Sequence, residues 1–288
     1  MDHGLKTLLH GYNLTTRDDS ENALKEVVQH LALMGLWRSR FFEHTAFYGG
    51  TALRILHGSG RFSEDMDFSL LKKNNAFDLR PYLKAIRTEL EAFGFEYTVE
   101  TRDKQNNSNI ESAFIKGNTA TNLLTIGVHQ EIVGKFHRNQ KIKIKFEVDT
   151  DPPPKAEYEV KNVLVPIPFQ VKVFTQPDLF AGKMHAVLCR QWKSRVKGRD
   201  FYDLIWFLGK KIPCHLDHLK ERMIQTDHWK REDPMDRSAL LELLNKKFGE
   251  IDFKMLKADV QPFIKDPHEL DLWSQAFFCD IILHLEVC

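Results

Sequence analysis

The sequence has 288 residues, of which 42% are hydrophobic and 28% are charged, and its formal net charge is +1 at pH 7. This composition is typical of a globular protein with one large domain or two modest ones, and no apolar run is long enough to span a bilayer. The near-zero net charge excludes nucleic-acid binding over the whole surface and confines any such contact to the basic segments 135–145 and 190–199.

The N-terminus lacks the basic region and the long apolar core of a secretory signal. The cysteines are scattered and form no CxxC pair, so reduced thiols are expected. They are Cys189, Cys214, Cys279 and Cys288. We therefore expect a cytoplasmic protein that does not associate with membranes.

The first part of the chain predicts a helix, a strand, a glycine turn and an acidic strand. Apolar residues recur at helical spacing over 21–34, and Gly35 is a plausible end of this helix. A strand is predicted over 45–48, followed by a Gly-Gly turn and a short helix over 51–57. A second strand is predicted over 63–70.

The middle of the chain predicts a helix and further strands. Residues 79–93 have the helical period, whereas 95–100 and 110–115 favour strands. The segment 119–133 is ambiguous. Residues 140–149 alternate between apolar and charged side chains, which is typical of a half-buried strand.

The consecutive prolines 152–154 interrupt this pattern because they supply no amide donors. A last strand is predicted over 171–174, and helices follow. Three of these helices are expected at 216–224, 236–248 and 270–285. The sequence therefore predicts an α+β protein, with a mixed-sheet core over 1–174 and a helical C-terminal portion over 175–288.

Asp65 and Asp67 are the first candidate functional pair. Side chains two residues apart in a strand point the same way, so these carboxylates should project together. Like charges so close repel unless a cation lies between them. Carboxylate oxygens are ligands of Mg²⁺, which commonly shares its coordination shell with substrate phosphates.

Gly49 and Gly50 supply the complementary feature. Glycines let backbone amides approach a phosphate, and the helix that starts near Thr51 offers free N–H groups at its N-terminus. A phosphate-binding turn beside metal-binding carboxylates predicts phosphoryl or nucleotidyl transfer. The segment Gly58–Gly60 is not a dinucleotide-binding fingerprint, because Ser63 replaces the third glycine and a helix precedes it.

Fourteen residues separate Gly50 from Asp65, and this spacing resembles motif I of the DNA polymerase β-like nucleotidyltransferases. The fuller string GGTAL…RFSEDMDF is similar to the AbiEii/AbiGii toxins, the toxin half of bacterial toxin–antitoxin and abortive-infection systems. The resemblance covers residues 45–205. It implies that Glu147, on a polar strand face, is the third metal-binding acid. Asp149 on the same face is the alternative.

The segment from Asp178 to Asp203 resembles motif III of the same family. It implies that Lys183 and Asp200 belong to the active site and that Lys183 contacts nucleotide phosphates. Lys183 and Arg190 are seven residues apart, which would place them on one helical stripe. Asp200 could instead join Arg199 and Asp203 in a local salt-bridge network, and for Asp203 a structural role is favoured.

Taken together, the residues and the resemblance predict a Mg²⁺-dependent nucleotidyltransferase that transfers NMP from an NTP to an RNA acceptor. The resemblance implies the tRNA 3′ end as acceptor and a cognate antitoxin as partner, and no DNA partner is predicted. The predicted catalytic residues are Asp65, Asp67, Lys183 and Asp200. The predicted metal ligands are Asp65, Asp67 and Glu147. The predicted nucleotide-binding residues are Gly49, Gly50, Thr51, Arg61, Ser63, Lys183 and Arg190.

Two alternatives remain open at this point. One is a nucleotidyltransferase that modifies a protein or a small molecule, and the other is a nucleotide-binding regulatory module without turnover. A further prediction concerns Ser63, because a phosphate there would add negative charge beside the metal site and silence the enzyme. The segment Cys214–His218 holds potential metal ligands but lacks the second pair of a structural zinc site.

Overall fold

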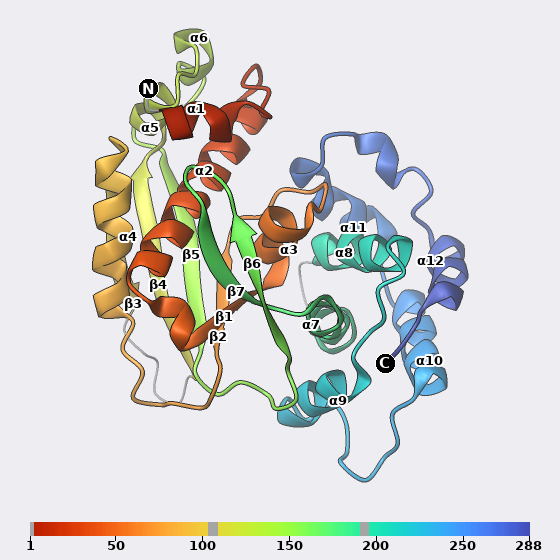
Figure 1. Cartoon of the computed structure of the whole chain (residues 1–288). Coiled ribbons are helices and arrows are strands. Elements are labelled where there is room, and N and C mark those ends of the chain that lie inside the picture. Colours follow the sequence, from red (N-terminus) through yellow and green to blue (C-terminus); the bar gives the residue numbers. More distant parts are fainter. Residues whose placement is uncertain (1–2, 103–108, 191–195) are drawn as a thin grey trace. The chain divides into compact units, whose positions relative to one another are not determined.

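The computed structural model describes residues 3–102, 109–190 and 196–288. These residues form two compact units (Figure 1). Unit 1 contains Met1–Leu56, Phe62–Pro152 and Glu159–Val173, and unit 2 contains His57–Arg61, Pro153–Tyr158 and Phe174–Cys288. The domain division at residue 174 remains a prediction, and two short segments before that residue, His57–Arg61 and Pro153–Tyr158, belong to unit 2.

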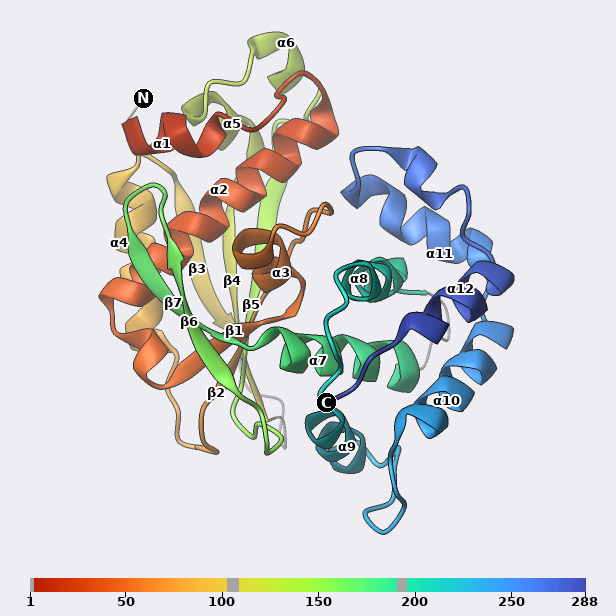
Figure 2. The same ribbon diagram turned by 45° about the vertical axis from the view of Figure 1, so that its right-hand side comes forward.

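A seven-stranded mixed sheet runs through the described residues of the first half, in the order β3-β4-β5-β2-β1-β7-β6 (Figures 1 and 2). Its strands are β1 (Thr45–Tyr48), β2 (Met66–Leu70), β3 (Tyr97–Arg102), β4 (Ile110–Asn118), β5 (Lys141–Asp149), β6 (Tyr158–Val163) and β7 (Phe169–Phe174). β1 is antiparallel to β2, whereas β2 is parallel to β5 and β1 is parallel to β7. This sheet and its helices confirm the predicted α+β class.

Helix α2 crosses this sheet, and its residues 26–36 are buried on all sides, the polar Glu26, Gln29 and His30 included. The helices of this half are α1 (His3–Leu9), α2 (Arg17–Arg38), α3 (Gly49–His57), α4 (Arg80–Ala92), α5 (Thr119–Thr125) and α6 (Gln130–Val133). The prediction that α2 ends at Gly35 is wrong. A Cβ at Gly35 would come within 2.9 Å of the Ala85 carbonyl oxygen, so this glycine lets α2 and α4 pack closely.

Aromatic side chains form the core beneath the central strands. Phe68 stacks between Phe47 and Phe146, with ring centroids 4.8 and 4.7 Å away, and Phe41 packs edge-on against it at 5.1 Å. Burial of each such ring contributes roughly 1.5–3 kcal/mol. Because side chains alternate along a strand, this apolar face leaves the opposite face of β2 and β5 to the intervening polar residues.

Several element boundaries differ from the predictions. β2 begins at Met66 and not at residue 63, so Ser63 and Asp65 lie in the irregular segment before it. The ambiguous segment 119–133 forms α5 and α6, and β6 was not predicted. α3 begins at Gly49, two residues earlier than predicted.

Unit 2 is mainly helical. Its α-helices are α7 (Gln176–Cys189), α8 (Gly198–Gly209), α9 (Leu216–Gln225), α10 (Arg237–Gly249), α11 (Phe253–Val260) and α12 (Gln275–Ile281). The prediction of one helix over 270–285 is wrong, because Ser274 accepts a hydrogen bond from the Phe277 amide and starts α12 as a new helix. Phe201, Phe248 and Phe278 form an aromatic core among these helices. In the described parts of the chain, no helix combines the length and the apolar character needed to cross a membrane.

Candidate active site

Two of the predicted acids are neighbours in the sheet of unit 1. Asp67 on β2 is in register with Glu147 on the parallel strand β5, and Tyr48 on β1 faces Asp67 from the other side. Paired positions on adjacent strands project to the same face. Because Phe68 and Phe146 occupy the core face, Asp67 and Glu147 share the opposite, partly exposed face.

Gly49 lies directly beneath the Asp67 carboxylate. Its φ is +83°, a conformation that L side chains rarely adopt, and a Cβ there would come within 2.5 Å of Asp67 Oδ2. Glycine is therefore required for both its backbone conformation and its lack of a side chain. The structure thus brings the predicted glycine turn and one predicted acid into direct contact.

Asp65 is held through its backbone. The Thr51 hydroxyl donates to the Asp65 carbonyl oxygen, and the Gln29 amide donates to the carbonyl oxygens of Ser63 and Glu64 at 3.0 Å each. Because Ser63 and Asp65 precede β2, strand alternation does not set the direction of either side chain, and their predicted roles stay predictions. Thr51 is buried and its hydroxyl is engaged, so its predicted contact with a nucleotide stays a prediction.

The Glu147 carboxylate contacts a lysine of its own strand and a serine of the neighbouring strand. Lys145 Nζ lies 2.7 Å from Glu147 Oε1, and the Ser112 hydroxyl lies 3.4 Å from the same oxygen. Asp149, the alternative ligand, accepts the Asp151 amide at 2.9 Å in the turn after β5. Among the described residues, no group of three or more His, Cys, Asp or Glu side chains is arranged to hold a metal. The metal ligand set therefore stays a prediction.

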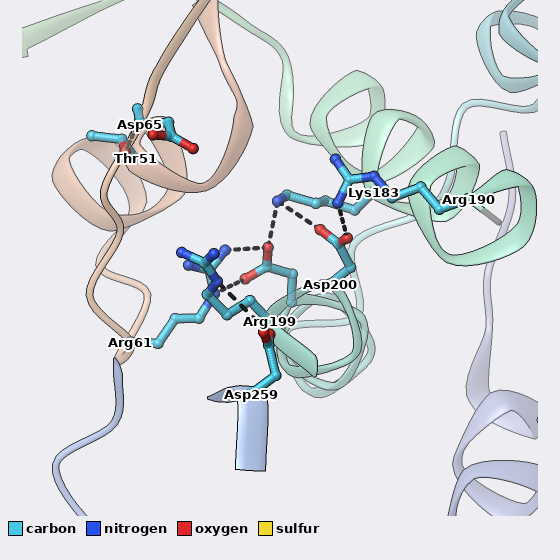
Figure 3. Close-up of polar contacts among 9 residues, drawn as sticks. Thr51, Arg61, Asp65, Lys183, Arg190, Arg199, Asp200 and Asp259 are labelled. Carbon is cyan, nitrogen blue, oxygen red and sulfur yellow. Dashed lines mark hydrogen bonds and ion pairs between the residues drawn. The ribbon is translucent and has the colours of Figure 1, made fainter. Parts of the chain in front are cut away.

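In unit 2, a buried network joins α7 and α8 (Figure 3). Lys183 Nζ lies 2.7 Å from Asp203 Oδ2 and 3.3 Å from Asp200 Oδ1. Arg61 donates two hydrogen bonds to Asp203, of 2.7 and 2.6 Å, and Arg190 pairs with Asp200. Arg61, Lys183 and Arg190 thus contact the two carboxylates of Asp200 and Asp203.

The charges in this network stabilise one another. Burial raises the pKa of the Asp200 carboxyl, but Lys183, Arg190 and Arg61 outweigh this effect and hold that pKa below its ordinary value. Burial lowers the pKa of Arg61, and the Asp203 carboxylate more than compensates. Arg61 is 2% exposed, whereas the Lys183 and Arg190 side chains are 12% and 47% exposed. Only the last two offer an accessible surface to a ligand.

The structure changes the reason why Lys183 and Arg190 converge. α7 ends at Cys189 and Arg190 has an extended backbone, so the prediction of a shared helical stripe is wrong. Both side chains instead reach Asp200 on α8. Sequence reasoning assigned Asp203 a structural role but missed its contacts with Arg61 and Lys183. Its spacing of three residues from Asp200, which places both acids on one side of α8, was the available signal.

Two other features singled out in the sequence are the segment Cys214–His218 and the basic segment 190–199. His215 Nδ1 lies 2.7 Å from Asp178 Oδ1, and His218 Nδ1 lies 3.0 Å from the Pro154 carbonyl oxygen. These histidines thus hold the start of α9 to neighbouring segments of unit 2. Half of the predicted basic segment 190–199, residues 191–195, lies outside the described residues.

The family model of the nucleotidyl transferase AbiEii toxin, of type IV toxin–antitoxin systems, matches residues 31–277. The chain belongs to the AbiEii nucleotidyltransferase toxin family. This membership confirms the resemblance seen in the sequence and identifies the protein as a toxin–antitoxin nucleotidyltransferase, for which a nucleotide substrate and an antitoxin partner are implied.

A solved structure supports the fold of this AbiEii family member. JHP933 from Helicobacter pylori matches with a TM-score of 0.50 and 15% sequence identity, over 90% of this chain and 89% of that one. A second H. pylori protein, whose name gives nucleotidyltransferase as an inferred activity, matches with a TM-score of 0.49 and 16% identity, over 90% and 92% of the two chains. No curated protein matches the chain in sequence.

Proposed function

We propose that this AbiEii toxin is a Mg²⁺-dependent enzyme that transfers a nucleoside monophosphate from an NTP to the 3′ end of tRNA in the cytoplasm. The observation that carries this proposal is the placement of Asp67. Its carboxylate is in register with Glu147 on one side and lies over Gly49, at the start of α3, on the other. Acidic and phosphate-binding features thus meet within one unit.

In the proposed reaction, the 3′-hydroxyl oxygen of the acceptor attacks the α-phosphorus of the NTP. A new P–O bond forms, the bond between the α-phosphorus and its bridging oxygen breaks, and pyrophosphate leaves. The hydroxyl proton passes to a carboxylate of the site or to water. To catalyse this reaction, the protein must position the two reactants and stabilise the negative charge that develops on the leaving pyrophosphate.

The donor chemistry of unit 1 fits Mg²⁺. Asp65, Asp67 and Glu147 would hold the ion, since carboxylate oxygens are hard ligands and two of these side chains share one sheet face. Bound Mg²⁺ would supply charge stabilisation for the transferring phosphoryl group. Gly49 and Gly50 let backbone N–H groups at the start of α3 approach the phosphates without hindrance from side chains.

The buried network of unit 2 fits the negatively charged phosphates. Lys183 and Arg190 are its partly accessible cations, and Asp200 orients both of them. Lysine would act as a point charge and arginine as a two-pronged donor. Arg61 is committed to Asp203, so its predicted contribution to nucleotide binding would act through the position of Lys183.

The test uses purified protein, Mg²⁺, total tRNA and each α-labelled NTP in turn. We expect label on tRNA with at least one NTP, and none with Asp67→Asn. Label on protein or on a small molecule, with none on RNA, would show that the proposed acceptor is wrong and that the proposed transfer reaction is right. Nucleotide binding without pyrophosphate release would reject transfer altogether.

A further inference from the structure

The polar face of β4 and β5 carries an unusual combination of side chains. On β5, the residues that share a face with Glu147 are Lys141, Lys143 and Lys145, and the register places Phe114 of β4 opposite Lys145 and Lys116 opposite Lys143. We name Phe114, Lys116, Lys141, Lys143 and Lys145 the basic face. Its residues are exposed or half-buried, while the alternate residues of both strands are buried.

Phe114 has no role in the core of unit 1. Its strand neighbours Ala113 and Ile115 are fully buried on the opposite face, whereas Phe114 remains partly exposed. The amino groups of Lys143 and Lys116 lie 3.8 and 5.6 Å from the centroid of its ring. An aromatic ring is therefore presented at the surface with cations beside it, an arrangement that serves nucleic-acid binding in other folds.

The charge of the basic face is only partly balanced. Lys116 pairs with Glu100, and Lys145 pairs with Glu147. Lys143 is exposed and forms no ion pair among the described residues, and its amino group lies over the Phe114 ring. An excess of positive charge beside an accessible aromatic ring complements a polymer that carries both phosphates and bases.

We propose that the basic face binds single-stranded RNA, with a base stacked on Phe114 and the flanking phosphates on Lys116 and Lys143. This inference rests on the proposed function, because it assigns a binding surface to the acceptor. Phe114 is opposite Lys145, which is two residues before Glu147 on β5. At the rise of a strand, this separation is about 7 Å, so a bound strand would extend directly toward the proposed carboxylates.

The experiment measures binding of a fluorescently labelled, unstructured RNA of about ten nucleotides by anisotropy, without NTP. Phe114→Ala should weaken binding by about 5- to 100-fold, whereas Phe114→Tyr should restore it, because both rings stack on bases. Lys143→Ala should reduce the slope of log affinity against log salt by about 0.7, the value for one phosphate contact on a single strand. Lys84→Ala, which changes an exposed lysine on α4, is the matched control and should alter neither quantity.

The outcomes separate this surface from the proposed reaction. Wild-type RNA affinity in Phe114→Ala, or equal effects of Lys143→Ala and Lys84→Ala, would overturn the inference. If tRNA is labelled normally by both basic-face variants, the reaction stands and the surface is wrong. If the variants weaken RNA binding but the wild type transfers no nucleotide to any RNA, the surface stands and the reaction is wrong. Unchanged thermal unfolding of Phe114→Ala would show that the loss is not a folding defect.

Discussion

The contact between Gly49 and Asp67 leads to the sharpest prediction about the site. Gly49→Ala would introduce a methyl group 2.5 Å from Asp67 Oδ2 and 3.2 Å from its Cβ. Cβ atoms essentially never come within 3.0 Å of such a neighbour, so the carboxylate must move by at least about half an ångström. The substitution should therefore disturb the proposed active site directly.

Two effects contribute to the expected magnitude. Alanine at φ +83° costs about 1–2 kcal/mol of folding stability because of its left-handed backbone. Displacement of Asp67 acts separately on the reaction, since a misplacement of about 1 Å can reduce a rate by about 100-fold. Gly49→Ala should thus lose much more activity than its loss of stability explains.

Gly58 provides the matched control. Its φ is +72°, but a Cβ there would have nothing within 4 Å. Gly58→Ala should show the same backbone cost in urea unfolding and should keep its rate of nucleotidyl transfer. Both variants are compared with the wild type at a temperature where all three proteins are folded.

Two outcomes of the comparison between Gly49→Ala and Gly58→Ala would contradict this reasoning. If Gly49→Ala transfers nucleotide at the wild-type rate, or if Gly58→Ala loses as much activity as Gly49→Ala, then contact with Asp67 does not explain the requirement for glycine. The assignment of Asp67 to the reaction would lose its geometric basis.

Three further predictions concern residues that support the site. Asp203→Asn leaves the buried Arg61 and the half-buried Lys183 without their shared carboxylate, and it should cost about 3–5 kcal/mol in urea unfolding; a cost below about 1 kcal/mol would show that the network is not required. Because the pKa of Asp200 is lower in the folded protein than its ordinary 3.8, its stabilising effect is complete above that value and is lost as pH falls through the folded pKa. The stability difference between wild type and Asp200→Asn should therefore shrink below about pH 4, and a constant difference would contradict the shift. Gln29→Leu removes both hydrogen bonds to the segment before Asp65 and should slow transfer; equal rates in wild type and Gln29→Leu would show that this anchoring does not matter for the reaction.

The fold class and the pairing of glycine turn with acidic strand could be predicted from the sequence because they depend on local patterns. Alternation over 140–149 identified β5 and the polar face of Glu147. The Gly-Gly pair after a short apolar strand identified the start of α3. Both features reflect constraints that act within a few residues.

Other features depend on contacts between distant segments and have no local signature. Gly35 is a typical helix end in sequence, yet its role is set by the approach of Ala85 on α4. One partner of Asp203 is Arg61, 142 residues away, and no periodicity relates them. The sequence predicts a strand from residue 63, but the sheet pairing begins at Met66, so Asp65 lies before the strand.

The most direct test of the central claim compares the single-turnover rate of labelled NMP transfer in Asp67→Asn, Glu147→Gln and Asp149→Asn. Asp149 accepts a turn amide beside the site and serves as the matched carboxylate on the same strand. The Asp67 and Glu147 variants should each slow transfer by more than about 100-fold, and Asp149→Asn should stay near the wild-type rate. Wild-type transfer in Asp67→Asn or Glu147→Gln would contradict the claim that this pair of carboxylates carries the reaction.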